Sequence, residues 1–105
     1  MATHRYLGEF ELLVLTAMVR LGADAYGASI RQEIESRAER SVSIGALYAT
    51  LSRLEDKAYV RSWTGEATPT RGGRAKRFFE LTALGRTQLE KSVTAMNNML
   101  EGVKL

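Results

Sequence analysis

The chain has 105 residues, a formal net charge of +3 and a pI near 9.5. It contains no cysteine, which excludes disulfides, thiolate zinc sites and thiol nucleophiles. The composition is that of one small globular domain, and because neither a signal-like apolar segment nor a membrane-length apolar run is present, we expect a cytoplasmic protein.

Two helices are expected at the start of the chain. Residues 7–21 carry a wide apolar stripe at helical spacing, and Gly22 is a residue type that commonly ends a helix. Residues 26–37 carry a narrower stripe that includes Ile30 and Ile34. The link between the two segments is only a few residues long, so the second helix must turn sharply away from the first.

A third helix is predicted within Ser41–Val60, with Ser43 as its N-cap. Its apolar stripe consists of Ile44, Leu47, Tyr48, Leu51, Leu54 and Ala58. On the opposite face, the first two turns carry small residues, namely Gly45, Ala46 and Ala49, followed by Ser52. A small, nearly neutral face suits a helix that enters a DNA major groove. The alternative is an alanine-rich surface helix. Together with the preceding helix, this segment predicts a helix-turn-helix.

The pattern then changes to the period of two that is typical of strands. Residues 59–63 are rich in strand-forming side chains, and Lys76–Leu81 forms a second such run with Phe78 and Phe79 on opposite faces. The segment between them, Thr64–Gly73, contains several turn-forming residues. A hairpin directly after a helix-turn-helix predicts a winged helix.

Positive charge gathers at the tip and return strand of this hairpin. Four basic residues with no acid among them lie within seven positions: Arg71, Arg74, Lys76 and Arg77. Such a loop is typical of a wing that contacts phosphates or the minor groove. The alternative is a basic loop that is simply solvated.

The rest of the chain predicts one long amphipathic helix capped by Thr82. Its apolar residues step by four, three, four and three, as in a helix–helix seam: Leu89, Val93, Met96, Leu100 and Val103, with Met99 beside them. No later element could cover this stripe, so we expect a second copy of the chain to bury it. The alternative is that the helix folds back on its own domain. The predicted fold class is mainly α with a small β-hairpin, with a winged helix-turn-helix at residues 1–81 and a dimerisation helix at 82–105.

The sequence resembles the PadR family of bacterial transcriptional regulators. The resemblance is spread over four stretches: LGEFELLVL, AYGASI, SIGALYATLSRLE at Ser43–Glu55, and RGGRAKRFFELTALGR at Arg71–Arg86. Together they cover about residues 7–89, and the third stretch is the most specific.

The resemblance implies a homodimeric winged-helix regulator with a recognition helix at residues 43–57, a basic wing at 64–76 and a C-terminal dimerisation helix. It implies DNA contacts by Ser43, Gly45, Ala46, Tyr48, Ala49, Arg71, Arg74 and Lys76. Two features depart from the family pattern. Ala58 stands where the family usually has a glycine, which predicts a different turn there. The C-terminal part is a single helix, which argues against an elaborate effector domain.

Three residues have two interpretations each. Tyr48 either donates its hydroxyl to a phosphate or is a core tyrosine bonded to a backbone carbonyl, and the motif favours the phosphate. Arg53 either contacts the DNA backbone or forms an ion pair within the domain. Trp63 either packs between strands, which we favour, or lines an effector pocket at the dimer interface.

These observations predict a dimeric, sequence-specific DNA-binding regulator that acts as a repressor on a palindromic operator. The assigned dimer interface is Leu89, Val93, Met96, Met99 and Leu100. A small aromatic or lipophilic effector is a candidate partner, and no cofactor or metal is expected. His4 is the only histidine, so the sequence offers no nucleophile–base pair and we expect no enzyme. The rival hypothesis is a winged-helix protein-interaction module without DNA affinity.

Overall fold

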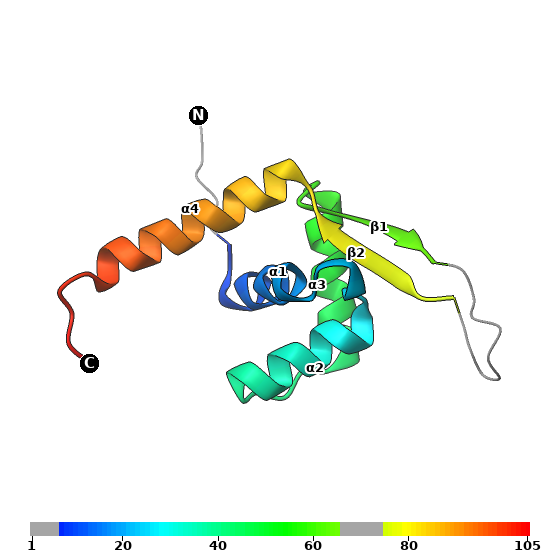
Figure 1. Ribbon diagram of the computed structural model, residues 1–105, viewed down its shortest axis with the longest axis horizontal. Coiled ribbons are helices and arrows are strands. Elements are labelled where there is room, and N and C mark those ends of the chain that lie inside the picture. The colour runs from blue at the N-terminus through cyan, green and yellow to red at the C-terminus, as the bar shows by residue number, and fades with distance from the viewer. Residues whose placement is uncertain (1–6, 66–74) are drawn as a thin grey trace.

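The computed structural model describes residues 7–65 and 75–105. Figure 1 shows a compact group of helices with a hairpin projecting on one side and a long helix on the other. The elements in order are α1 (Glu9–Leu21), a 3₁₀ turn (Gly22–Asp24), α2 (Gly27–Ala38), α3 (Ile44–Asp56), β1 (Val60–Thr64), β2 (Arg77–Leu81) and α4 (Ala83–Leu100). The predicted fold class, mainly α with a small hairpin in a winged-helix arrangement, is confirmed.

The core lies where α1, α2 and α3 meet. Leu15, Ile30 and Leu51 are among its fully buried side chains. The predicted stripe of α3 is buried at Leu47, Leu51 and Leu54, but its first-turn Ile44 is exposed. Burying one side of α3 against α1 and α2 leaves its small-residue side facing solvent.

The two predicted N-caps are confirmed. Ser43 Oγ accepts a hydrogen bond from the Ala46 amide at 3.1 Å, and Thr82 Oγ1 accepts one from the Gly85 amide at 3.0 Å. The first helix starts two residues later than predicted because the Gly8 amide donates to the Glu11 side chain (2.8 Å), which sets the first turn there.

The turn after α3 corrects the prediction made from Ala58. Ala58 has a φ of +64°. Its amide donates to Glu55 O and the Tyr59 amide donates to Leu54 O, both at 2.9 Å. These are the two bonds of the Schellman motif, which glycine normally closes. The chain therefore keeps the turn and places alanine in the left-handed conformation, at a cost of about 1 kcal/mol.

The hairpin pairs Ser62 with Phe79 and Trp63 with Phe78 in an antiparallel register. Because side chains alternate along a strand, Ser62, Arg77 and Phe79 share the face toward α3, and Phe79 is buried there. A third segment extends this small sheet, since the Phe79 amide donates to Ala25 O at 2.9 Å.

The C-terminal helix corrects a second prediction. Leu89, assigned to the dimer seam, is only 8% exposed and belongs to the domain's own core. The fold-back alternative therefore holds for the first half of α4. From Val93 onward the apolar residues remain exposed, because α4 extends past the end of the core.

Replacing Ala58 with glycine should stabilise the fold by about 1 kcal/mol, since glycine adopts a positive φ without strain. Urea unfolding followed by circular dichroism measures this change. Ala49→Gly is the matched control and should destabilise by a similar amount, because Ala49 lies within the helix. Equal effects of the two substitutions would contradict the strain assigned to Ala58.

A carboxylate joins the start of α1 to the end of α3. Burial of Glu11 disfavours its charge, but the Gly8 amide and the Lys57 ammonium, 3.0 Å away, outweigh that penalty. The pKa of Glu11 is therefore lowered from its ordinary value. A carboxylate with a lowered pKa contributes stability above its unfolded pKa and loses it as the pH falls through the folded pKa.

Glu11→Gln should therefore lower the free energy of unfolding at neutral pH and flatten its decline as the pH drops below 4.5, the ordinary glutamate value. Chemical denaturation at a series of pH values measures both effects. Glu90→Gln, at an exposed position on α4, is the control and should change neither. An unchanged pH profile in the Glu11 variant would refute this role.

Candidate nucleic-acid interface

The exposed face of α3 is built from small side chains. Ser43, Gly45, Ala46 and Ala49 are all exposed, whereas Leu47, Thr50 and Leu51 anchor the helix from behind. A Cβ added at Gly45 would meet nothing within 4 Å. Packing within the domain therefore does not require glycine there, although glycine costs about 1 kcal/mol in a helix. Because its side chains are short, another molecule can approach this face of α3 closely.

Tyr48 extends from α3 toward the start of α2. A Cβ added at Gly27 would lie 2.1 Å from the Tyr48 hydroxyl oxygen, so the hydroxyl rests on a position that only glycine leaves open. The ring is 43% exposed and tilted against Phe79, with 6.5 Å between centroids. Within the described residues the hydroxyl has no hydrogen-bond partner, so the backbone bond of the core-tyrosine alternative is not formed.

Three basic residues of the hairpin were predicted to contact DNA, and the structure describes one of them, Lys76. Arg71 and Arg74 lie outside the described residues. Lys76 stands at the base of the hairpin loop, where its ammonium lies 4.3 Å from the centroid of the Tyr26 ring. Tyr26 precedes the first turn of α2, so this contact places a positive charge beside the start of that helix.

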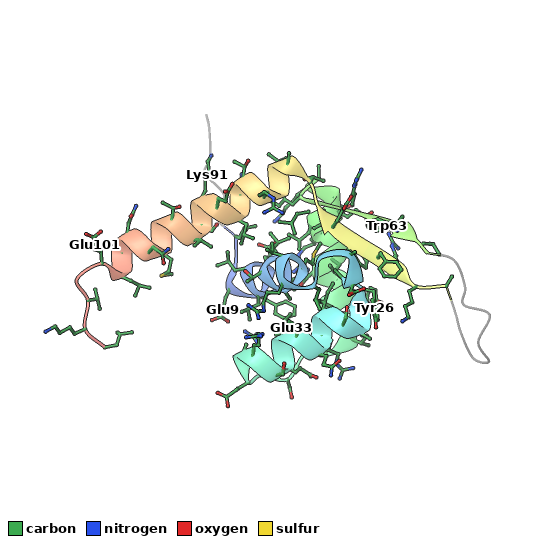
Figure 2. The ribbon with its side chains drawn as sticks, viewed as in Figure 1. Glu9, Tyr26, Glu33, Trp63, Lys91 and Glu101 are labelled. Atoms are coloured by element: carbon green, nitrogen blue, oxygen red, sulfur yellow. The ribbon has the colours of Figure 1, made fainter. Side chains whose placement is uncertain are left out.

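An aromatic stack braces the same end of the hairpin. Trp63 stacks on Phe78 with 5.9 Å between ring centroids, and Phe78 meets Tyr26 edge-on at 5.7 Å. Trp63 and Tyr26 lie at this end of the molecule in Figure 2. The packing interpretation of Trp63 is confirmed.

Sequence reasoning missed the role of Arg77. Its guanidinium faces α3, where it bonds Glu55 at 3.0 Å and Ser62 at 2.8 Å. Glu55, an acid of α3, therefore meets the base of the basic hairpin. No signal in the sequence links residues 22 positions apart, although the shared strand face of Ser62 and Arg77 could have suggested that pair.

Arg53 was expected either to contact the DNA backbone or to form an ion pair within the domain. Its guanidinium donates to Thr50 Oγ1 at 3.0 Å, one turn earlier on the same helix. Among the described residues it forms no ion pair, so the ion-pair alternative is not observed. The DNA-backbone alternative stays a prediction.

The exposed half of α4 forms an apolar surface. Val93, Met96, Met99 and Leu100 are between 44% and 75% exposed. An apolar groove of about 260 Å³ runs beside them between α4 and the start of α1, and its lining is Leu7, Leu12, Ser92, Ala95, Met96 and Met99. The hydroxyl of Ser92 is buried there and has no hydrogen-bond partner among the described residues. In a single chain this apolar surface is exposed to solvent.

Over residues 7–65 and 75–105, none of the helices combines the length and apolarity needed to cross a membrane. In the same part of the chain, acids and histidines form no group of three that could hold a metal ion.

Comparison with known families gives one assignment. The model of the "Transcriptional regulator PadR-like family" matches residues 14–91, which span both the helix-turn-helix and the hairpin. A search of curated protein sequences finds no match.

Solved structures share the fold. A PadR family transcription regulator from hypervirulent Clostridium difficile R20291 has a TM-score of 0.76 at 24% identity, over 90% of this chain and 93% of that one. F93 from STIV, a winged-helix DNA-binding protein, has a TM-score of 0.72 at 23% identity, over 95% of this chain and all (100%) of that one. Bacillus subtilis PadR in complex with operator DNA has a TM-score of 0.68 at 18% identity, over 81% of this chain and 46% of that one.

Proposed function

The chain belongs to the PadR-like family of transcriptional regulators, and we propose that it is a homodimeric repressor that binds a palindromic operator in the cytoplasm. The observation that carries this proposal is the bare, exposed face of α3, whose Gly45 has no packing reason to be small. A major groove admits an α-helix when short side chains allow close approach. The family is one of regulators rather than enzymes, in agreement with the absence of a catalytic pair from the sequence.

The first turns of α3 would enter the groove, with Ser43, Gly45, Ala46 and Ala49 nearest the bases. Few of these side chains can form hydrogen bonds to base edges, so recognition rests on close fit, thymine methyl contacts and DNA shape. The Tyr48 hydroxyl, free within the described residues, would donate to a phosphate. The nearby first turn of α2 favours the same anion through its unpaired amides.

The hairpin would bind the flanking backbone. Lys76 is held at its base by the Tyr26 ring, close to the start of α2. Arg71 and Arg74 are proposed to contact phosphates as well, on the strength of the sequence motif. Bacillus subtilis PadR, which shares the fold, was solved with operator DNA, and this supports DNA as the partner.

The dimer would form through α4. Val93, Met96, Met99 and Leu100 present apolar area that water would otherwise cover, and a second copy offers the same complementary stripe. Leu89 is left out of this interface because it is already buried. A small aromatic or lipophilic effector is proposed to act at this seam, where the groove beside Ser92 offers apolar walls.

Selection of bound fragments from a genomic DNA pool, followed by gel shifts on the recovered duplexes, tests the function. A repressor of this kind should retain one family of sequences that contain inverted repeats, with half-sites about one or two helical turns apart. A protein-interaction module would give only weak binding without sequence preference, which salt abolishes.

Lys76→Gln should weaken binding to selected and random duplexes alike. It should also reduce the slope of log affinity against log salt by about 1 per protomer, because one phosphate contact is lost. Fluorescence anisotropy across a salt series measures both quantities. Lys91→Gln is the matched control, since Lys91 is an exposed residue of α4 (Figure 2) and its loss changes the charge equally. If both variants behaved alike, Lys76 would not contact DNA.

Met96→Glu should convert the dimer to a monomer and lower DNA affinity, because it places a charge in the centre of an apolar seam. Sedimentation equilibrium gives the oligomeric state. Thr94→Glu introduces the same charge on the opposite face of α4 and should leave the dimer intact. A wild-type monomer, or a dimer that survives Met96→Glu, would refute the assigned seam.

A further inference from the structure

Three side chains from three elements form a closed polar ring at the base of the hairpin. Glu55 of α3 accepts from Arg77 of β2 at 3.0 Å through Oε1 and from the Ser62 hydroxyl of β1 at 2.6 Å through Oε2. Ser62 Oγ in turn accepts from Arg77 at 2.8 and 3.0 Å. We call Glu55, Ser62 and Arg77 the clasp.

The clasp lies beside the buried Phe79, on the side of the hairpin that packs against α3. Val60 and Phe79 are the buried side chains of the two strands, and burial decreases toward the Thr64 end. A hairpin without such support is marginally stable in water. On its other face, Phe78 braces the hairpin against Tyr26 of α2. The clasp is therefore the polar connection between the hairpin and the last turn of α3.

The clasp also adjoins the side of α3 that is proposed to face DNA. A small crevice of about 50 Å³ separates α3 from the hairpin, and Tyr48, Ser52, Glu55 and Arg77 are among its lining residues. A change in the clasp would therefore alter the spacing between the recognition face and the hairpin.

The positive charge of Arg77 is paired with a carboxylate of the same chain. Its guanidinium pairs with Glu55 and lies 5.5 Å from the Phe79 ring centroid, on the inner face of the hairpin. Although Arg77 belongs to the basic run that was predicted to form the wing, the pair that it makes with Glu55 carries no net charge. Arg77 thus differs from Lys76, whose ammonium has no carboxylate partner among the described residues.

We infer that Glu55 and Arg77 are positioning residues for DNA recognition: they fix the hairpin relative to α3 so that both reach one duplex at a single spacing. This inference rests on the proposed function. Phosphate contacts set the register in which a helix meets the bases, so a hairpin that tilts loses matched contacts on the operator. Binding to arbitrary sequences depends on net charge and tolerates the tilt.

The direction in which Glu55→Gln changes DNA affinity separates this role from simple electrostatics. Glu55→Gln removes a negative charge near the proposed interface, and Coulomb attraction alone would then tighten binding to DNA. Loss of the clasp should instead weaken binding to the selected sequence. Glu80→Gln is the matched control, because Glu80 pairs with Arg61 on the outer face of the same strands and does not join them to α3.

The experiment uses the full chain and two probes, a duplex recovered by selection with the wild-type protein and a random-sequence duplex of equal length. Glu55→Gln should lower affinity for the selected duplex about three- to tenfold. It should leave affinity for the random duplex and the salt slope unchanged or slightly higher. Arg77→Lys should behave like Glu55→Gln despite its retained charge, because an ammonium cannot replace the two-pronged guanidinium. Glu80→Gln should match the wild type on the selected duplex.

A DNA-free measurement accompanies these titrations. The Gly65 amide donates to Lys76 O at 2.7 Å, just beyond the clasp, so its hydrogen exchange reports how firmly this end of the hairpin is held. Exchange should be faster in Glu55→Gln and Arg77→Lys than in Glu80→Gln, while circular dichroism shows that all three remain folded.

Three outcomes would overturn the inference. Glu55→Gln could bind the selected duplex as tightly as Glu80→Gln does, Arg77→Lys could keep wild-type affinity, or Gly65 exchange could be unchanged. If the wild type bound no duplex, the proposed function would fail and the DNA role of the clasp with it. If Gly65 exchange were still faster in Glu55→Gln and Arg77→Lys, the clasp would hold the hairpin as described and only the proposed function would be wrong.

Discussion

The structure depends on one close backbone approach, between the first turn of α4 and the chain reversal after α3. A Cβ at Gly85 would lie 1.9 Å from the Tyr59 carbonyl oxygen, so no other residue fits there without backbone movement. Thr82 closes the junction: its amide donates to Tyr59 O at 3.0 Å and its hydroxyl donates to Ala58 O at 2.6 Å. The end of α3 and the start of α4 are thereby joined as one rigid corner.

This corner would link the geometry of the proposed dimer to the position of α3. If the exposed half of α4 binds a second copy, the orientation of each α3 follows directly from how the two α4 helices cross. The spacing of half-sites in an operator is then a property of the seam around Met96, not of α3 itself. An effector in that seam could change DNA affinity only if it bound two crossing geometries with different affinity.

Part of the positive charge of this chain is paired within the domain. Arg77 is neutralised by Glu55, and Glu33 accepts from both Arg20 and Arg37, which lowers the pKa of Glu33. What distinguishes the proposed interface is shape: a helix face without long side chains, a tyrosine resting on a glycine, and a hairpin held by a clasp and an aromatic stack. Such a surface favours recognition by fit over recognition by hydrogen bonds to bases.

The local features could be predicted from the sequence, because they depend on neighbours within a few positions. The sequence predicted the helical period, the caps at Ser43 and Thr82, and the strand alternation of Phe78 and Phe79. It also predicted the family. The tertiary fold set which surfaces meet. It buried Leu89, kept the turn at Ala58 and paired Arg77 with Glu55. Periodicity identifies an apolar or charged face, but the partner of that face comes from residues far along the chain, whose approach the local pattern does not encode.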